Sequence, residues 1–305
     1  MRIVRNLASY PADVGPSVVA LGAFDGIHLG HRAILGEAVT RGKAASAAVV
    51  ACTFDRHPME VLQPERAPLP IATLAERLDL IADTGVDLTL VLAFTAALAA
   101  MEPEAFVSDV LVGRLRAREV VVGYNHTFGR GARGDAQLLT TLGGPIGLVT
   151  HVVPPLLVDG VAVSSSEIRA ALKSGDLVQA ARCLGRPYAI AGTIGRGAGR
   201  GRTLGFPTAN LEAERPLLVP TGVYACRAEL DGQLHPAVVN VGVRPTFGEE
   251  TLAIEAYLMD FAGDLYGRRM RLHFIARLRG EQKFPSVQEL RTQIGLDVAA
   301  ARQCL

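Results

Sequence analysis

Residues 22–31 read Gly-Ala-Phe-Asp-Gly-Ile-His-Leu-Gly-His, and this stretch decides how the first half of the chain is interpreted. An apolar run over residues 17–21 precedes it, and a pattern typical of a helix follows over residues 32–39. The two histidines, with Gly30 between them, therefore lie at a junction between a strand and a helix. Such a junction in a parallel α/β sheet presents backbone N–H groups and a helix dipole to phosphate. The stretch thus predicts chemistry on a nucleoside triphosphate.

The length and composition predict two domains in a reducing compartment. The chain has 305 residues, 49% of them hydrophobic, which is enough for two cores. Its net charge of +1 argues against nucleic-acid and membrane-surface partners. The four cysteines are scattered without a CxxC motif, and no secretory signal or run of the roughly 20 apolar residues of a membrane helix is apparent. We therefore expect a cytoplasmic protein.

The first 185 residues alternate between strand-like and helix-like segments. Short apolar runs indicate strands over residues 18–24, 47–54, 88–94, 119–123 and 146–153. Helical patterns lie between and after them, over residues 32–43, 73–84, 103–116, 135–142, 166–173 and 176–184, with Asp176 as the N-cap of the last. Near-continuous apolar strands separated by helices predict a parallel sheet with helices on both faces. We assign residues 1–185 to this domain.

The pattern changes from residue 186 onward. Short alternating segments separated by turn residues cover residues 188–192, 222–230, 236–241, 254–259 and 270–276. Segments of this kind are typical of an antiparallel barrel or sandwich. Helical patterns over residues 286–294 and 297–304 follow. Residues 186–305 therefore predict a mainly antiparallel β domain that ends in helical segments.

The histidine pair fits the chemistry of phosphate. A histidine near neutral pH can donate a hydrogen bond and carry positive charge, so His28 and His31 at a helix N-terminus can follow the charge that builds on a phosphate. Gly30 lets the backbone approach closely, and Asp25 with Gly26 would shape the turn. Alone, the spacing also fits ordinary loop residues or a metal pair.

Two later segments are candidates for the same site. Asn125 follows the strand that ends at residue 123, and strand C-termini in such sheets face the ligand crevice. Ser164, Ser165, Ser166 and Arg169 place three hydroxyls and a cation at a predicted helix start. Without other information, an N-cap by Ser166 and a solvated arginine are the better explanation of this second segment.

Together these segments resemble the adenylyltransferase module of bacterial bifunctional riboflavin kinase/FAD synthetases, which belongs to the HxGH nucleotidyltransferases. The resemblance rests on residues 22–31, 53–58, 123–135 and 164–169. It implies a Rossmann-like domain in which His28 and His31 are catalytic and polarise the ATP phosphates. It further implies that ATP and FMN are bound by Gly22, Phe24, Asp25, Gly30, Asn125, Ser164, Ser165, Ser166 and Arg169. The family usually has proline in place of Arg56 and a Phe-Arg pair in place of His126-Thr127.

A second constellation opens the C-terminal domain. Residues 192–210 are rich in glycine and arginine and end in Phe-Pro-Thr-Ala-Asn, without a Walker A match. The glycines permit a backbone nest around phosphate, although a solvated basic turn or an RNA-contacting loop would look the same. Thr208 and Asn210 offer neutral oxygen ligands suited to Mg²⁺ held mainly by ATP phosphates. Either Glu255 or Asp260 could act as the base for an alcohol.

This constellation resembles the riboflavin kinase module of the same family, and the two resemblances cover essentially the whole chain. The matching segments are residues 192–210, 221–224, 239–247, 260–267 and 281–284. The resemblance implies Glu255 as the catalytic base and Mg-ATP on Thr208 and Asn210. It implies ATP and flavin contacts from Gly197, Gly199, Gly205, Phe206, Pro207, Thr208 and Asn210.

The prediction is therefore a bifunctional enzyme that converts riboflavin to FMN and FMN to FAD with ATP and Mg²⁺. We expect riboflavin, FMN and ATP as its partners, no nucleic acid or membrane, and a monomer or weak homo-oligomer. One alternative is an enzyme of the same superfamily with another phosphate acceptor, which the Phe-Pro-Thr-Ala-Asn domain disfavours. The other is a catalytically silent flavin-binding or RNA-associated regulator, which the net charge and the set of reactive residues disfavour.

Overall fold

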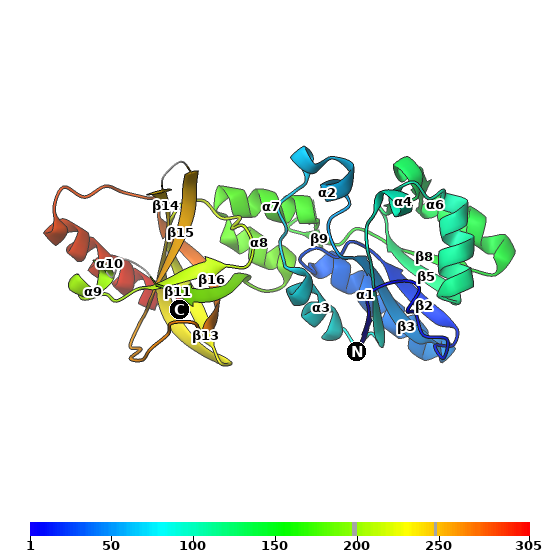
Figure 1. Ribbon diagram of the computed structural model, residues 1–305, viewed down its shortest axis with the longest axis horizontal. Helices are drawn as coiled ribbons and strands as arrows, with labels where there is room; N and C mark the ends of the chain where they lie inside the picture. The colour runs from blue at the N-terminus through cyan, green and yellow to red at the C-terminus, as the bar shows by residue number, and fades with distance from the viewer. Residues whose placement is uncertain (197–199, 247–248) are drawn as a thin grey trace. The chain divides into compact units, whose positions relative to one another are not determined.

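Strand β2 (Ser17–Leu21) lies inside a parallel sheet, directly before the histidine stretch. The computed structural model describes residues 1–196, 200–246 and 249–305. The sheet has the strand order β1-β4-β3-β2-β5-β8, and each neighbouring pair is parallel (Figure 1). Its other strands are β1 (Arg2–Val4), β3 (Ala48–Phe54), β4 (Leu88–Leu92), β5 (Ala117–Gly123) and β8 (Val149–Val153). The predicted parallel sheet is confirmed.

Both faces of this sheet are buried, because alternate residues of its strands belong to two separate cores. On β2, Val18 and Ala20 pack with Leu35 of a helix on one face. Val19 and Leu21 belong to the core of the opposite face. Successive residues of a strand point to opposite sides, so this division means that helices cover both faces, as the near-continuous apolar strands predicted.

The segments between the strands are mostly short helices. The longer ones are α1 (Leu29–Ala45), α3 (Leu74–Ala82), a π-helical stretch (Phe106–Arg114) and α6 (Ala136–Gly143). Shorter pieces are α2 (Met59–Leu62), α4 (Ala96–Ala99), α5 (Pro103–Ala105) and three 3₁₀ turns (Pro64–Arg66, Arg130–Ala132 and Gly144–Ile146). Two small antiparallel pairs are β6 (Thr127–Phe128) with β7 (Gly134–Asp135) and β9 (Leu157–Val158) with β10 (Val161–Ala162).

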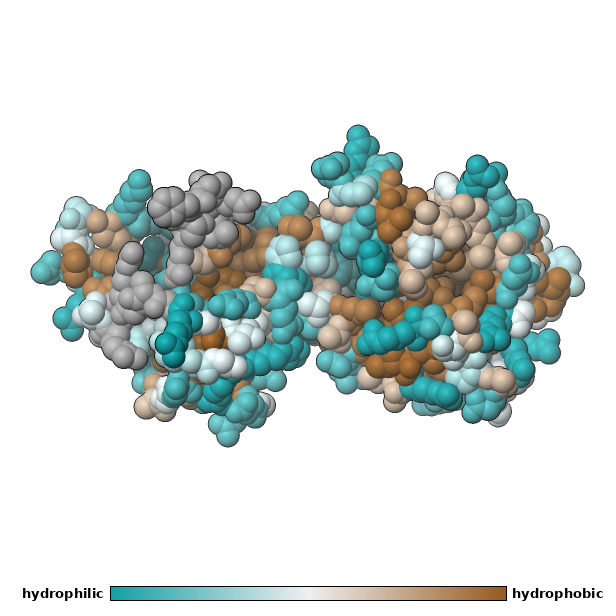
Figure 2. Space-filling view, viewed as in Figure 1, coloured by the Kyte–Doolittle hydropathy of each residue, from teal (hydrophilic) through white to brown (hydrophobic). Residues whose placement is uncertain are grey.

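The N-terminal strand β1 was not predicted. It pairs with β4 at one edge of the sheet, and its three residues are too few to show a hydrophobic period. The opposite edge, β8, exposes the apolar side chains of Val149 and Val152. Figure 2 shows such apolar residues at the surface among hydrophilic ones.

The C-terminal half forms a closed antiparallel barrel with the order β11-β12-β15-β14-β13-β16 (Figure 1). Its strands are β11 (Tyr188–Gly195), β12 (Ala209–Ala213), β13 (Gly222–Leu230), β14 (Gln233–Thr246), β15 (Glu249–Leu258) and β16 (Arg269–Arg279). A short helix, α9 (Arg200–Thr203), lies between β11 and β12. The predicted barrel is confirmed, but its strand β12, which begins within the Gly-rich stretch of residues 192–210, was not predicted.

The C-terminal end is one helix, α10 (Val287–Cys304), rather than the two predicted segments. Ser286 caps it, as its side chain accepts a hydrogen bond from the Glu289 backbone. Asp297, expected at the start of a second helix, instead turns its carboxylate into a buried ion pair with Arg279 of β16. The helix therefore continues through this position.

Two helices connect the sheet to the barrel in sequence, α7 (Ser165–Ser174) and α8 (Leu177–Leu184). Asp176 caps α8 through a hydrogen bond from the Gln179 backbone, as predicted. By internal contacts, the chain divides into compact units of residues Met1–Ser165 and Ser166–Leu305. The boundary at residue 185 stays a prediction. Among the described helices, none is long and apolar enough to cross a membrane.

Candidate active sites

The loop after β2 holds a backbone shape that side chains rarely adopt. Phe24 and Ile27 have positive φ angles of 53° and 39°, and both side chains are fully buried. Bulky residues in this left-handed region cost free energy that the surrounding structure must offset, and such strain is typical of functional sites. Because the chain turns at Phe24, β2 ends at Leu21 instead of reaching residue 24 as predicted.

Two buried charged side chains hold this loop in place. The Asp25 carboxylate accepts hydrogen bonds from the backbone N–H groups of Ile71 at 3.1 Å and Ala72 at 3.2 Å. Nη1 of Arg77, on α3, donates to the carbonyl oxygen of Ala23 at 2.6 Å. Backbone N–H groups of the segment before α3 and the Arg77 side chain of α3 therefore hold the loop in this conformation.

The two histidines stack at the start of α1. Their ring centroids lie 3.6 Å apart with an angle of 17° between the planes. His28 is the N-cap of α1, and its Nδ1 accepts the backbone N–H of His31 at 3.2 Å. A neutral His28 therefore carries its proton on Nε2, since Nδ1 is occupied as an acceptor. The pair lies at the positive end of the helix dipole, where anions are stabilised.

His31 is held in its neutral form. Burial is the main cause that lowers its pKa well below 6.5, with smaller effects of the neighbouring His28 and the Arg77 charge. Its Nδ1 is buried, and within residues 1–196, 200–246 and 249–305 it has no hydrogen-bond partner. A buried nitrogen of this kind is costly unless it serves a ligand. An arriving phosphate would supply both the partner and the negative charge that raises the pKa.

Close approach disfavours a side chain at two glycines of the stretch. A Cβ on Gly30 would lie 3.2 Å from both Cε1 and Nδ1 of the His28 ring. A Cβ on Gly22 would come within 2.7 Å of the Phe24 ring. Side chains at either position would therefore disturb the histidine pair or the strained loop.

The loop lies at the point where the strand order of the sheet reverses. From β2, the sheet extends through β3 on one side and through β5 on the other. Ligands of open α/β sheets bind at this switch point, beyond the carboxyl ends of the strands. Asn125 follows the carboxyl end of β5, and its Oδ1 is 3.5 Å from the Cβ position of Gly123. Asn125 therefore stands at the same edge as the histidine loop.

The serine run also approaches this loop. Oγ of Ser165 donates to the carbonyl oxygen of Asp25 at 3.2 Å, and the Val163 carbonyl oxygen lies 3.6 Å from the Cβ position of Gly30. Ser165 begins α7, so Ser166 lies inside the helix, and its reading as an N-cap is wrong. Arg169 follows on α7, within the second compact unit.

The two departures from the family pattern have different surroundings. The side chain of Arg56 is exposed and pairs with the neighbouring Asp55 at 3.3 Å. The ring of His126 lies parallel to that of Phe128, with a centroid distance of 6.0 Å and an angle of 18°. Burial lowers the pKa of His126 to about 4. His126 is thus packed as a neutral aromatic side chain.

The candidate residues of the second site lie opposite one another on neighbouring strands of the barrel. Asn210 of β12 is directly opposite Glu255 of β15, and Glu255 is directly opposite Asn240 of β14. Residues opposite each other in an antiparallel pair point to the same face, with Cβ atoms about 5 Å apart. Amide, carboxylate and amide thus form a row across three neighbouring strands.

The segment before β12 depends on close packing against a glycine. A Cβ on Gly201 would lie 2.4 Å from the Phe206 carbonyl oxygen and 3.0 Å from Oγ1 of Thr208. The Phe206 ring packs edge-on against Tyr257 of β15 at 5.3 Å. Gly205 has a φ of 86°, which favours glycine. Pro207 lies between these contacts in sequence, and the candidates Gly197 and Gly199 lie outside the described residues.

Asp260 is distant from this row. It follows the end of β15, five residues beyond Glu255, and forms an ion pair with Arg302 of α10 at 2.8 Å. The strand from Glu255 to its end at Leu258 alone spans roughly 10 Å. Of the two carboxylates that sequence left open as a base, Glu255 is therefore the one beside Asn210.

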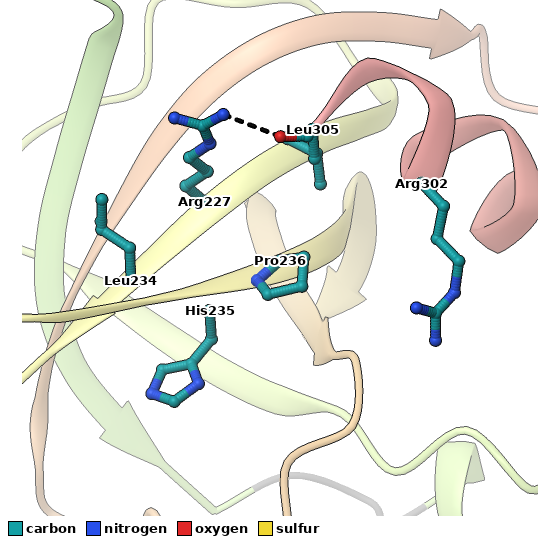
Figure 3. Close-up of a pocket in the computed structure, with 6 residues that line it drawn as sticks. All are labelled: Arg227, Leu234, His235, Pro236, Arg302 and Leu305. Carbon is teal, nitrogen blue, oxygen red and sulfur yellow. Dashed lines mark hydrogen bonds between the residues drawn. The ribbon is translucent and has the colours of Figure 1, made fainter.

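A hollow of about 420 Å³ lies near this ion pair, on the C-terminal unit. Figure 3 shows its lining, in which Nη2 of Arg227 donates to the backbone oxygen of Leu305 at 2.8 Å. The hollow is lined by Arg227, Leu234, His235, Pro236, Arg302 and Leu305. None of the candidate site residues is among them.

Sequence reasoning missed three residues of these sites. Arg77 and Gly201 act through contacts made across loops, which no spacing in the sequence reports. Asn240 stands in the Val-Asn-Val-Gly segment that contributed to the family resemblance, but its position opposite Glu255 needs the strand register. The Val-Asn-Val-Gly segment was the one feature of the sequence that could have indicated Asn240.

Comparisons with known proteins agree with both halves. Residues 11–167 match the sequence model of the FAD synthetase family, and residues 184–305 match that of the riboflavin kinase family. Three bacterial relatives carry the name bifunctional riboflavin kinase/FMN adenylyltransferase. The Pseudomonas fluorescens protein is 40% identical, covering 99% of this chain and 97% of the relative. Those of Escherichia coli K12 and Bacillus subtilis are both 36% identical, covering 99% and 92% of this chain and 96% and 90% of their own lengths.

One solved structure has the same fold over the full length. A Streptococcus pneumoniae chain described as a macrolide-efflux protein aligns with a TM-score of 0.91 and 30% sequence identity. The alignment covers 99% of each chain. The Streptococcus pneumoniae chain therefore has the same two folds as this chain, in the same order.

Proposed function

Because the chain belongs to the family of bifunctional riboflavin kinase/FMN adenylyltransferases, we propose how its two sites divide the family's reactions. The chain is a riboflavin kinase and an FMN adenylyltransferase. The kinase transfers the γ-phosphoryl group of ATP to riboflavin and forms FMN. The adenylyltransferase joins AMP from a second ATP to FMN and forms FAD and pyrophosphate. We assign the limits of the two domains to residues 1–185 and 186–305.

The stacked histidine pair at the start of α1 is the observation that carries the adenylyltransferase assignment. A phosphate oxygen of FMN attacks the α-phosphorus of ATP, and the bond from that phosphorus to the pyrophosphate oxygen breaks. Negative charge grows on the leaving pyrophosphate. Nε2–H of His28 and the backbone N–H groups of α1 can donate to these oxygens, and His31 can gain a proton as the charge develops.

The other residues of the first site bind and orient the two nucleotides. Gly22, Phe24, Asp25 and Gly30 shape the loop around the phosphates, and their strain and close contacts support this role. Asn125, Ser164, Ser165, Ser166 and Arg169 supply amide, hydroxyl and guanidinium groups for ATP and FMN. We infer these roles from the position of the loop at the switch point of the sheet.

Glu255 is the proposed base of the kinase site. Its carboxylate takes the proton of the riboflavin 5′-hydroxyl as the oxygen attacks the γ-phosphorus and the bond to ADP breaks. Its position opposite Asn210 supports this role, because the nucleotide is assigned to that strand. Backbone groups of Gly197, Gly199, Gly205, Phe206 and Pro207 would surround the ATP phosphates.

Thr208 and Asn210 fit a magnesium ion that is bound mainly by ATP. A hydroxyl and an amide oxygen are hard, neutral ligands of the kind Mg²⁺ accepts beside phosphate oxygens. When bound, Mg²⁺ neutralises the charge of the transferring phosphoryl group. A Cβ on Gly201 would lie 3.0 Å from Oγ1 of Thr208, so the glycine leaves free the space beside this hydroxyl.

The partners of the chain follow from these assignments. We propose riboflavin, FMN and ATP as its only substrates, without a nucleic-acid or membrane partner, because the net charge is only +1. The cysteines Cys52, Cys183, Cys226 and Cys304 are free, which supports a reducing cytoplasmic location. We propose a monomer or weak homo-oligomer.

A time course of flavin products tests the proposed function. The purified chain is incubated with riboflavin, Mg²⁺ and ATP, and the flavins are separated by chromatography. We expect FMN to rise first and FAD to follow as FMN is consumed. Recovery of riboflavin alone would overturn the proposal.

A further inference from the structure

The row of polar residues in the kinase site extends past the proposed base. Asn240 is directly opposite Glu255 on the side away from Asn210. Its other cross-strand partner is Val223 of β13, which packs in one apolar cluster with Ala301 of α10. The row therefore lies on the face of the barrel that α10 covers at one end.

Glu281 brings a second carboxylate to this row. A Cβ built on Gly242 would lie 2.8 Å from Oε1 of Glu281 and 3.4 Å from Nδ2 of Asn240. Gly242 and Asn240 are two residues apart on β14, so they belong to the same face of the strand. The missing side chain of Gly242 thus makes room for the Glu281 carboxylate beside the Asn240 amide.

The position of Glu281 is anchored by its neighbours. Arg279, two residues earlier, binds the Asp297 carboxylate with Nη2 at 2.8 Å and Nε at 3.0 Å, and Asp297 is buried. The same guanidinium lies over the ring of Phe284, 5.6 Å from its centroid. The segment that carries Glu281 is therefore tied to β16 and α10.

The geometry of phosphoryl transfer indicates what this pair binds. The attacking and leaving oxygens lie roughly in line, on opposite sides of the phosphorus. The nucleotide is assigned to β12, on one side of Glu255, and the reacting hydroxyl of the acceptor gives its proton to Glu255. The rest of the acceptor therefore extends over β14, on the other side. Riboflavin carries a chain of hydroxyl groups next to the one that reacts. An amide donates to and accepts from hydroxyls, and a carboxylate accepts from them.

We propose that Asn240 and Glu281 bind the hydroxyl chain of riboflavin and select for it. This inference rests on the proposed kinase function and adds the residues that recognise its acceptor. Each would contribute hydrogen bonds to the polyol and none to the nucleotide. Because Gly242 has no side chain, both groups have room to reach the polyol.

The test compares riboflavin with lumiflavin, which has a methyl group in place of the hydroxyl chain. Asn240→Ala and Glu281→Ala are each assayed for the KM of riboflavin, the KM of ATP and the inhibition constant of lumiflavin. We expect the riboflavin KM to rise about tenfold or more in each variant, as for the loss of one or two hydrogen bonds. The other two constants should change less than about twofold, because lumiflavin and ATP do not reach the pair.

Two further variants sharpen the result. Gly242→Ala should raise the riboflavin KM in the same way, because its methyl group displaces the Glu281 carboxylate. Gln233→Ala removes an exposed amide at the start of the same strand and should leave all three constants unchanged. The unchanged KM of ATP and inhibition constant of lumiflavin, both measured on the barrel itself, report that each variant of this unit is folded.

An unchanged riboflavin KM in Asn240→Ala and Glu281→Ala would overturn the inference. A loss of lumiflavin binding equal to that of riboflavin would also overturn it, because it would mean a general disturbance of the flavin site. Failure of the proposed function looks different, since then the unaltered chain would form no FMN at all.

Discussion

At the scale of single residues, burial keeps three titratable groups of the first domain uncharged. It lowers the pKa of His31 well below its ordinary value and that of His126 to about 4, and it raises the pKa of Cys52 to about 12. Nδ1 of His31 has no hydrogen-bond partner among the described residues, and under the proposed function a phosphate would bring charge to it. His126 lies against Phe128 and contributes as an aromatic side chain. The same physical cause thus gives two histidines different roles.

We expect His126→Phe to protect the N-terminal unit against mild acid. The pKa of His126 is about 4 in the folded chain and 6.5 when the ring is free, so between these values only the unfolded state binds the proton. The free energy of unfolding therefore falls as the pH is lowered, and from pH 7 to pH 5 this group accounts for about 2 kcal/mol of the loss. Phenylalanine cannot take up a proton.

Urea unfolding at pH 7 and pH 5, followed by circular dichroism, measures this difference. The variant should lose about 2 kcal/mol less than the unaltered chain between the two pH values. Equal losses would mean that His126 titrates alike in the folded and unfolded states.

At the scale of elements, helix α1 contains one glycine with a close neighbour in the proposed site and one glycine in open space. A Cβ on Gly30 would press on the His28 ring, while a Cβ on Gly36 would meet nothing within 4 Å. Both residues lie in the same helix. Replacing each glycine with alanine in turn therefore distinguishes an effect on the site from an effect on helix stability.

We expect Gly30→Ala to lower FAD formation about tenfold or more, because a shift of the ring away from the phosphates weakens its hydrogen bonds. FMN formation should stay unchanged. Gly36→Ala should keep both activities and raise the free energy of unfolding by about 0.5–1 kcal/mol. Initial rates with FMN and with riboflavin as substrates measure the two activities. Equal FAD rates for the two variants would contradict the role of Gly30.

The elements also show what the sequence alone can predict. The apolar strands and the histidine stretch are local patterns, so the parallel sheet and the place of this stretch after its strand β2 were predictable. Strand β1 is too short to show a hydrophobic pattern. Strand β12 begins within the Phe-Pro-Thr-Ala-Asn motif, whose residues indicated a binding site rather than a strand. In α10, Asp297 pairs with Arg279 of β16 instead of starting a second helix, and this partner lies on another element. Contacts between segments far apart in sequence decided each of these cases.

At the scale of the whole molecule, the histidine pair proposed for one reaction and the base proposed for the other lie in different compact units. His28, His31 and the strained loop belong to the first compact unit, and Asn210 and Glu255 belong to the second. Sequence reasoning found these residues because each follows a recognisable motif. It could not find Arg77 or the place of Asn240, because a loop contact and a strand register define them.

This separation predicts that each activity can be removed alone. His28→Ala should lower FAD formation by about 10²–10³-fold, as for the loss of a donor to developing charge, and leave FMN formation intact. Glu255→Ala should block FMN formation, while FAD is still made from supplied FMN. His235→Ala, on the barrel, is a control for histidine removal and should keep both activities.

The most direct measurement is chromatography of the flavins formed by His28→Ala and Glu255→Ala, each supplied first with riboflavin and then with FMN. We predict that His28→Ala converts riboflavin to FMN and stops there. We predict that Glu255→Ala leaves riboflavin unchanged but converts FMN to FAD. Loss of both activities from a single substitution, in a chain that remains folded, would contradict the assignment of one reaction to each site.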